Sequence, residues 1–412
     1  MKTNTRKASS LSTLAAISCF AFSLMSFGQT PSHQFAAVDG SPRPQTTFTS
    51  LYSFYDENDG AFPAASLLLH KNIFYGTAST GGASGYGTVF VQAGVYHITL
   101  HSFGSGQDGF QPMGGLVMDS AGNIYGTTMY GGTGNCQYGC GTVFKVDTKY
   151  HYSLLFSFGG ISGEDGAYPM GDLIIDSAGN LYGTTVYGGD SNCNPGLGCG
   201  TVFKITPNNQ EYVLYRFAGS PDGASPIGHL ARDSAGSLYG TTLYGGNVCG
   251  GLGCGTVFKL DAHNNESVLH RFSGSHDGAS PAGGVVRDSA GTLYGTTSRG
   301  GASGFGTVVA LSQGQESVLY SFTNGSDGGT PTAGVHVDAH GAIYGTTQGG
   351  GYGLGVVFQL DTHHNYSVLH RFDNSDGNEP NTSIVEDAAG VLYGTTYVGG
   401  AHGYGTIFKI TP

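Results

Sequence analysis

The sequence predicts an all-β fold, a seven-bladed β-propeller of four-stranded antiparallel blades, and three observations support this class. Tyr-Gly-Thr occurs seven times, 49 to 57 residues apart, from Tyr75 to Tyr393. Fixed periods of this size are typical of solenoids and propellers. Each repeat holds four short apolar segments separated by turn residues, without helical periodicity. Gly supplies 73 of 412 residues and Trp is absent, a composition that favours turns and strands.

Residues 1–28 are predicted to be a cleaved signal peptide. Basic residues precede an apolar stretch that ends at Phe27, and small residues allow a cut after Gly28. A transmembrane anchor and a lipoprotein site at Cys19 are alternatives. The apolar stretch is short, contains Ser and continues past Cys19, which argues against both. Residues 29–46 are polar and contain Pro, so we interpret them as a linker.

The propeller is expected to occupy residues 47–412. In the second repeat the four segments, named A to D in chain order, are residues 114–119, 123–128, 141–146 and 152–158. "DSAGN" between A and B indicates a hairpin turn, with Gly supplying a positive φ. We interpret the Gly inside segment B as a packing feature, a place where a neighbouring blade lies close and the adjacent Tyr covers it.

The two ends of the repeat array complement each other. Residues 48–54 form a D-type segment without its own A, B and C, whereas the last repeat ends in a C segment without a D. We therefore expect residues 48–54 to pair with residues 405–411 as the outermost strand of the last blade. Such pairing would close the ring and remove an exposed sheet edge.

The connection between B and C varies in length, and its three long copies hold all six cysteines outside the signal peptide. Pairing within each loop is expected: Cys136 with Cys140, Cys193 with Cys199, and Cys249 with Cys254. Free thiols and metal binding are alternatives, but this spacing is a weak zinc signal. In a four-stranded meander the B–C and D–A connections emerge on one face. We expect ligands to bind on this face, because it carries the loops of variable length and the predicted disulfides.

Candidate binding residues come from the loops of this face. Exposed rings could stack on sugars or hold a partner, and the repeated Asp-Gly carboxylates could attract a cation. The alternatives are that the rings cover blade edges and each Asp caps its turn. "DENDG" at 56–60 resembles a calcium loop only faintly, so no metal is expected. The candidates are Tyr130, Tyr138, Tyr187, Tyr244, Asp108, Asp165 and Asp222.

The sequence favours a non-catalytic role but leaves catalysis open. His229 and His336 could face the central channel, yet neither has a Ser, Cys or carboxylate partner at diagnostic spacing. No cofactor motif is present. A formal charge of −12 argues against nucleic-acid binding, and no apolar stretch after the signal peptide could span a bilayer.

The leading hypothesis is a secreted or extracytoplasmic monomer that binds a glycan or a protein through the B–C/D–A face, as a binding or scaffold module. One alternative is a propeller enzyme, a lyase or glycoside hydrolase, with its site at the channel mouth. A cluster of His and carboxylates at that mouth would distinguish it. A purely structural role would predict neither pocket nor ligand.

The string "DSAGNLYGTT", followed by Gly-Gly and "GYGTVFK", resembles the GloVer repeat, the tandem repeat named for Gloeobacter and Verrucomicrobia, over residues 48–412. The resemblance implies an exported bacterial protein, of the periplasm or cell surface, with unassigned activity and no catalytic residues to carry over. "GTVVAL" at 306–311 and "GVVFQL" at 355–360 depart from the pattern. The sequence stops at Pro412 inside the last repeat, so the C-terminal anchor common in the family is not expected. Gly-Gly also resembles kelch repeats, but their Trp is missing.

Overall fold

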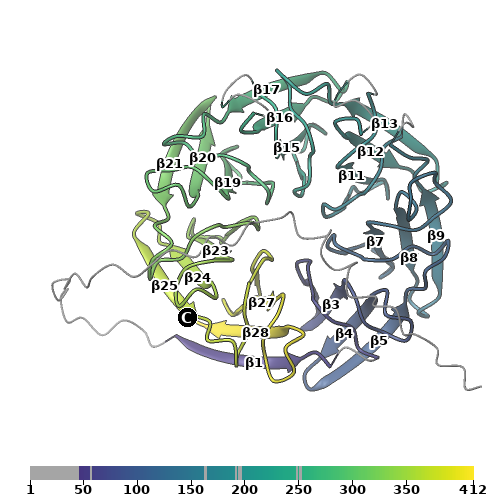
Figure 1. Ribbon diagram of the computed structural model, residues 1–412, viewed down its shortest axis with the longest axis horizontal. Coiled ribbons are helices and arrows are strands. Elements are labelled where there is room, and N and C mark those ends of the chain that lie inside the picture. Colours follow the sequence, from purple (N-terminus) through teal and green to yellow (C-terminus); the bar gives the residue numbers. More distant parts are fainter. Residues whose placement is uncertain are drawn as a thin grey trace, which may run out of the picture. The chain divides into compact units, whose positions relative to one another are not determined.

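The computed structural model describes residues 46–412 except 56–57, 162–164, 191–192, 194–196, 247–248 and 250–252. The predicted signal peptide and all but the last residue of the predicted linker lie outside the described residues. In the described part the chain forms 28 strands in seven four-stranded antiparallel sheets. Figure 1 shows these sheets standing as blades around a central hub, which confirms the predicted seven-bladed propeller. The same residues contain no helix that could cross a membrane.

The first three blades follow one another along the chain, each with its strands in sequence order from the hub outward. Blade one consists of β2 (Leu68–His70), β3 (Ile73–Ala78), β4 (Thr88–Ala93) and β5 (Tyr96–Ser102). Blade two consists of β6 (Val117–Met118), β7 (Ile124–Thr128), β8 (Thr142–Val146) and β9 (Tyr152–Ser157). Blade three consists of β10 (Ile174–Ile175), β11 (Leu181–Thr185), β12 (Thr201–Ile205) and β13 (Glu211–Arg216).

The next three blades repeat this order. Blade four consists of β14 (Ala231–Arg232), β15 (Leu238–Thr242), β16 (Thr256–Leu260) and β17 (Glu266–Arg271). Blade five consists of β18 (Val285–Arg287), β19 (Leu293–Thr297), β20 (Thr307–Ser312) and β21 (Gln315–Ser321). Blade six consists of β22 (His336–Val337), β23 (Ile343–Thr347), β24 (Val356–Leu360) and β25 (Tyr366–Arg371).

Blade seven joins the two ends of the propeller, as the sequence predicts. It consists of β26 (Val385–Glu386), β27 (Leu392–Thr396), β28 (Thr406–Thr411) and, outermost, β1 (Thr47–Ser53). Strands β1 and β28 pair antiparallel from Thr47 opposite Thr411 to Ser53 opposite Thr406, and they lie side by side in Figure 1. The unpaired edge of β28 is therefore covered by a strand that lies more than 350 residues away in sequence.

The Gly inside strand B packs against its own blade, which corrects the predicted contact with a neighbouring blade. Gly126 of β7 lies opposite Phe144 of β8. A Cβ on Gly126 would lie 2.6 Å from that ring and 2.8 Å from Leu116 of the same blade. The hydroxyl of adjacent Tyr125 donates to Asp119 in the A–B turn over 2.9 Å. The absent side chain makes room for the Phe of strand C.

The hydrophobic core is divided into layers that lie between neighbouring blades. One layer combines Phe158 at the end of blade two with Leu173 and Phe203 of blade three. The Phe158 and Phe203 rings meet edge to face with centroids 5.1 Å apart. The closing layer combines Phe54 and Ile407 of blade seven with Phe90 of blade one. The apolar side chains of each blade are thus buried against its two neighbouring blades. Because the ring is closed, no blade leaves its apolar face exposed to water.

Strand A is shorter than its predicted segment. The sequence predicts residues 114–119 as a strand, but only Val117–Met118 pair with β7. Gly114 and Gly115 instead lie at the hub against the next blade, where a Cβ on Gly114 would lie 2.5 Å from the Gly171 carbonyl oxygen. Small residues are needed there because the inner ends of neighbouring blades approach backbone to backbone.

Candidate functional site

The B–C and D–A loops do lie on one face, because they hydrogen-bond to each other. Within a repeat, Phe110 of a D–A loop forms an antiparallel bridge with Tyr130 of the following B–C loop, and Ala167 pairs with Tyr187 in the same way. Between blades, the Tyr168 N–H donates to the Cys140 carbonyl oxygen over 2.8 Å. The face is therefore a continuous network of loop backbone.

One residue of every D–A loop, directly before Pro, has the left-handed backbone conformation. Its N–H donates to the B–C loop of the preceding blade, and at Ser225 this hydrogen bond measures 2.9 Å to Cys199. A positive φ is unusual for residues other than Gly, so tertiary contacts must hold it. The seven residues, with φ between 52° and 60°, are Phe62, Gln111, Tyr168, Ser225, Ser280, Thr330 and Glu379.

The three predicted disulfides are present. Cys136–Cys140, Cys193–Cys199 and Cys249–Cys254 join Cα atoms 5.2, 5.6 and 5.7 Å apart. The sulfurs contact the adjacent D–A loop as well: a Cβ on Gly274 would lie 2.7 Å from both sulfurs of the third pair. Each disulfide therefore supports both kinds of loop on the face.

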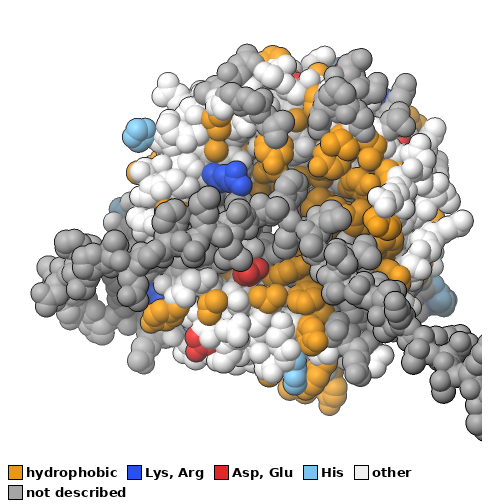
Figure 2. All heavy atoms as spheres, in the orientation of Figure 1, with side chains coloured by type: hydrophobic (Ala, Val, Ile, Leu, Met, Phe, Trp, Pro, Cys, Tyr) orange, Lys and Arg blue, Asp and Glu red, His pale blue; other side chains and the backbone are white. Residues whose placement is uncertain are grey.

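Aromatic side chains form a connected arc on this face over blades one to three. We define the aromatic arc as Tyr86, Phe110, Tyr130, Tyr168 and Tyr187. Ring centroids along it are separated in turn by 5.3, 5.2, 5.3 and 5.9 Å. Figure 2 shows hydrophobic side chains gathered over β7 and β11, with few charged side chains in this view.

Predicted Tyr130 and Tyr187 belong to the arc, and Tyr138 lies beside it with its ring 6.1 Å from that of Tyr130. Tyr138 is 42% exposed, whereas Tyr130, Tyr187 and Tyr244 are half-buried. Tyr244 lies near enough to Tyr187 to raise its pKa, although burial is the larger cause. The Tyr187 hydroxyl therefore stays a neutral donor and acceptor at ordinary pH.

Sequence reasoning missed the D–A residues of the arc, Phe110 and Tyr168. The signal was present: the residues between Asp-Gly and Pro are aromatic-containing in the first three repeats and small or polar in the other four. The dipeptides "AF", "FQ" and "AY" at this place each contain one aromatic residue, and they occur only in the three repeats over which the arc extends.

The predicted Asp residues are held within their own loops. Asp108, Asp165 and Asp222 each accept a backbone N–H from the residue that begins the D–A loop, over 3.0, 2.6 and 3.1 Å. Asp222 also accepts the Tyr215 hydroxyl over 2.8 Å. In these contacts the carboxylates accept hydrogen bonds that shape their own loops.

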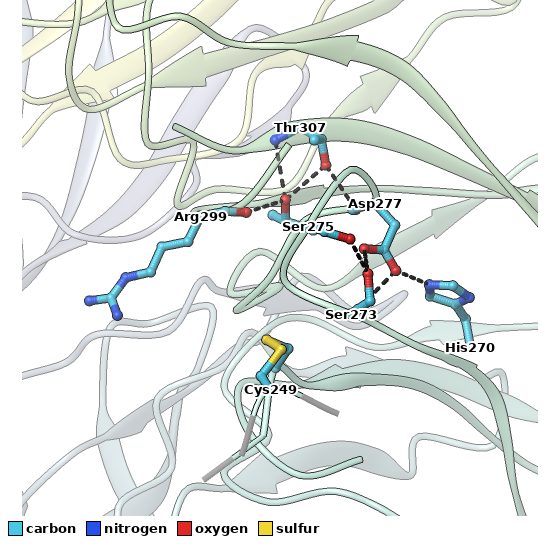
Figure 3. A network of polar contacts seen from close by, with 9 residues as sticks. Cys249, His270, Ser273, Ser275, Asp277, Arg299 and Thr307 are labelled. Carbon is cyan, nitrogen blue, oxygen red and sulfur yellow. Dashed lines mark hydrogen bonds and ion pairs between the residues drawn. A yellow bond between two sulfur atoms is a disulfide. The ribbon is translucent and has the colours of Figure 1, made fainter. Parts of the chain in front are cut away.

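Figure 3 shows the equivalent loop network around Asp277. The carboxylate accepts the Ser273 N–H over 2.9 Å and the Ser273 hydroxyl, and it lies 3.2 Å from His270 Nε2. The Asp lies between Ser and His. In a catalytic triad the His must lie between the other two to take the proton from Ser, so this arrangement is no triad.

The hub contains one unusual pair of side chains, Asp172 and His229. Both occupy the third position after a loop Pro, where other repeats have Gly or Ser. Asp172 accepts the Gly115 N–H over 2.5 Å. His229 reaches Gly334 of blade six, and its Nε2 is buried without a hydrogen-bond partner. Burial lowers the pKa of His229 although the Asp172 carboxylate acts in the opposite direction.

His336 also lies at the inner strands, with Nε2 2.9 Å from a Glu386 carboxylate oxygen in the next blade. Among the described residues no three His, Cys, Asp or Glu side chains converge to hold a metal ion. Two hollows lie on the opposite face, the side of the A–B and C–D turns. One, of about 200 Å³, is lined by Tyr75, Met118 and Tyr150 between blades one and two.

The Gloeobacter/Verrucomicrobia repeat model matches residues 41–195, 94–252 and 249–412. The chain belongs to this repeat family. The matches together span the whole propeller, in agreement with the seven copies of the motif. None of the curated proteins matches the chain significantly.

Solved structures with similar folds share little sequence with this member of the repeat family. The extracellular domain of a proposed one-component system from B. thetaiotaomicron is 8% identical, with a TM-score of 0.55, over 87% of this chain and 39% of that one. A proposed 6-phosphogluconolactonase from Bacteroides uniformis ATCC 8492 is 15% identical, with a TM-score of 0.52, over 80% of this chain and 88% of that one. At these identities the similarity shows the fold alone.

Proposed function

We propose that the protein is an exported binding module whose B–C/D–A face holds a neutral glycan against the aromatic arc. The observation that carries the proposal is the arc itself, five rings in consecutive contact on a face braced by three disulfides. Disulfides persist in oxidising compartments outside the cytoplasm, which supports a secreted, periplasmic or cell-surface location.

The chemistry of the arc favours a sugar ligand. Aromatic rings present flat apolar faces on which the C–H side of a sugar ring can lie, while Tyr hydroxyls can hydrogen-bond its rim. The pKa values of Tyr130 and Tyr168 are raised, first by burial and then by neighbouring Tyr residues. Their hydroxyls therefore carry no charge at neutral pH, and a neutral ligand suits them better than an ion.

An array of soluble oligosaccharides and peptides tests this proposal directly. We expect a neutral oligosaccharide to bind, and Tyr138→Ala to weaken it about fivefold, since one aromatic contact contributes about 1 kcal/mol. Tyr150→Ala is the matched control, because Tyr150 is 57% exposed but lies in a C–D turn on the opposite face. Binding of peptides alone, or binding weakened only by Tyr150→Ala, would contradict the proposal.

A hydrolytic or lyase activity at the hub is a second candidate, favoured by the Asp172–His229 pair and the orphaned Nε2 of His229. A neutral imidazole next to a carboxylate could act as a general base. Incubation of the chain with the bound oligosaccharide, followed by mass spectrometry of the products, tests it. Cleavage that is lost in His229→Gln would support this candidate, and an intact oligosaccharide would exclude it.

A further inference from the structure

One position of the outer strand is equivalent in all seven blades, and in three of them its side chain contacts the Asp-Gly loop that precedes the blade. This residue, which we call the seam position, pairs with the last apolar residue of strand C, or with Gln92 in blade one. The register places the following residues there, from blade one to blade seven: His97, Tyr152, Glu211, Glu266, Glu316, Tyr366 and Phe48.

In three blades the seam position supplies a hydrogen-bond donor to the same acceptor. The Tyr152 hydroxyl donates to the backbone carbonyl oxygen of Asp108, and the Tyr366 hydroxyl donates to that of Asp327. His97 Nε2 lies 3.4 Å from the Asp59 carbonyl oxygen. Each contact connects an outer strand to the loop that enters its blade, so the seam is a joint between consecutive blades.

Blades three, four and five place Glu at the seam position. Oε1 of Glu211, Glu266 and Glu316 is buried without a hydrogen-bond partner. A carboxylate can only accept hydrogen bonds, whereas a carboxylic acid also donates one. Thr256 Oγ1 donates to the Asp222 carbonyl oxygen over 3.0 Å. Because a carbonyl oxygen has two lone pairs, a second acceptor site remains for a donor from Glu266.

We propose that Glu211, Glu266 and Glu316 are carboxylic acids in the folded protein, each donating to the carbonyl oxygen of the preceding Asp-Gly loop as Tyr152 and Tyr366 do. Three of the seven blade joints then each hold a proton. Loss of that proton leaves a buried carboxylate facing a carbonyl oxygen and an Asp, which weakens the joint. The propeller would therefore loosen on one side as the pH rises.

The charges around each Glu agree with this assignment. Burial and then the Asp165 carboxylate raise the pKa of Glu211, against the opposing charge of Arg216, to about 7. Burial and then Asp222 likewise raise the pKa of Glu266, against Arg271, to about 7. Burial and then Asp277 raise the pKa of Glu316.

The direction of the pH dependence follows from these shifts. A Glu whose folded pKa is raised binds its proton in the folded state but has lost it in the unfolded chain between the two pKa values. The folded state thus holds up to three more protons between the unfolded Glu pKa of about 4.3 and pH 7. Stability from this source is fully present below the unfolded pKa and is lost as the pH rises through about 7 for Glu211 and Glu266.

The experiment compares the wild-type chain with a variant carrying Glu211→Gln, Glu266→Gln and Glu316→Gln. Gln donates a hydrogen bond at every pH, so the denaturation midpoint of the variant should fall less between pH 5 and pH 8.5. The variant should also be the more stable of the two at pH 8.5. The two proteins differ at these three positions alone, so the difference between their pH dependences reports on the three Glu. Glu379→Gln, outside the seam, should keep the wild-type dependence.

Infrared spectroscopy of the wild-type chain gives a second readout that does not need a folded variant. The carboxylic acid carbonyl band should be present at pH 6 and lost on raising the pH to 8.5. An absent band at pH 6, or equal pH dependence of stability in wild-type and triple-variant chains, would overturn the proposal.

Discussion

At the scale of single residues, six blades depend on a Gly in strand B that faces a Phe in strand C. A ring above each of these Gly residues occupies the space of a Cβ, at 2.5 or 2.6 Å. Blade five is the exception, because Val309 replaces the Phe opposite Gly295. A Cβ on Gly295 would meet nothing closer than 3.0 Å. The chain therefore contains its own control for this contact.

We expect Gly126→Ala to lower the free energy of unfolding by about 1–3 kcal/mol, the usual effect of overpacking a filled core. Gly295→Ala should change it by much less, because its Cβ meets the Gly284 carbonyl oxygen at 3.0 Å and no aromatic ring. Chemical denaturation of both variants measures the difference. Equal losses in the two variants would show that strand propensity, and not the Phe ring, requires the Gly.

The sequence predicts that this Gly is a packing residue but assigns it the wrong partner. Its partner Phe144 lies eighteen residues further along, beyond a loop whose length varies among the repeats. Gly126 and Phe144 face each other only in one register of the two strands, and the residues of strand B alone do not specify that register. The seam Glu residues escaped notice for the same reason, since their proposed acceptor lies far away in sequence, in the Asp-Gly loop that enters the blade.

At the scale of elements, the D–A loop is the joint between blades. The residue before Pro donates its N–H across the joint while its φ is held positive. Thr330 is the one β-branched residue among the seven, with φ of 54°, and a branched Cβ is poorly tolerated in that conformation. Its N–H nonetheless donates to Phe305 over 2.8 Å.

Thr330→Gly should raise the free energy of unfolding by up to about 1 kcal/mol, because Gly adopts a positive φ without steric strain. Thr330→Ala keeps a Cβ and should gain less. Thermal and chemical unfolding of the two variants provide the comparison. A Thr330→Gly variant less stable than Thr330→Ala would indicate that the Thr side chain contributes contacts worth more than the relieved strain.

Much of the element level could be predicted from sequence, because turns, strands and cysteine pairs repeat with the same chemistry. Strand A is the exception: its first residues pack backbone to backbone at the hub and form no ladder with strand B. The aromatic arc was half predicted. Tyr130 and Tyr187 stand in B–C loops, whereas Phe110 comes from the D–A loop paired with Tyr130 and Tyr168 comes from the D–A loop of the next blade. Sequence pattern does not show that these loops lie side by side.

At the scale of the whole molecule, the last blade and the core layer between blades seven and one depend on ring closure. Seven core layers each need two adjacent blades, and the layer between blades seven and one includes Phe54, the residue after β1. Closure also connects the loops of the B–C/D–A face at the two ends of the repeat array. There the Phe62 N–H donates to the Tyr404 carbonyl oxygen over 2.9 Å. Without β1, both this layer and the edge of β28 would meet water.

An engineered disulfide between β1 and β28 tests ring closure most directly. Thr49 lies opposite Lys409 in the antiparallel ladder, so Thr49→Cys with Lys409→Cys places two thiols on the same face of the blade. Ser50→Cys with Lys409→Cys is the control, because successive side chains of a strand point to opposite faces. We expect the 49–409 crosslink within a monomer after oxidation, found by non-reducing digestion and mass spectrometry, and little crosslink in the control. Absence of the 49–409 crosslink in the monomer would contradict a seven-bladed ring closed by its N-terminal strand.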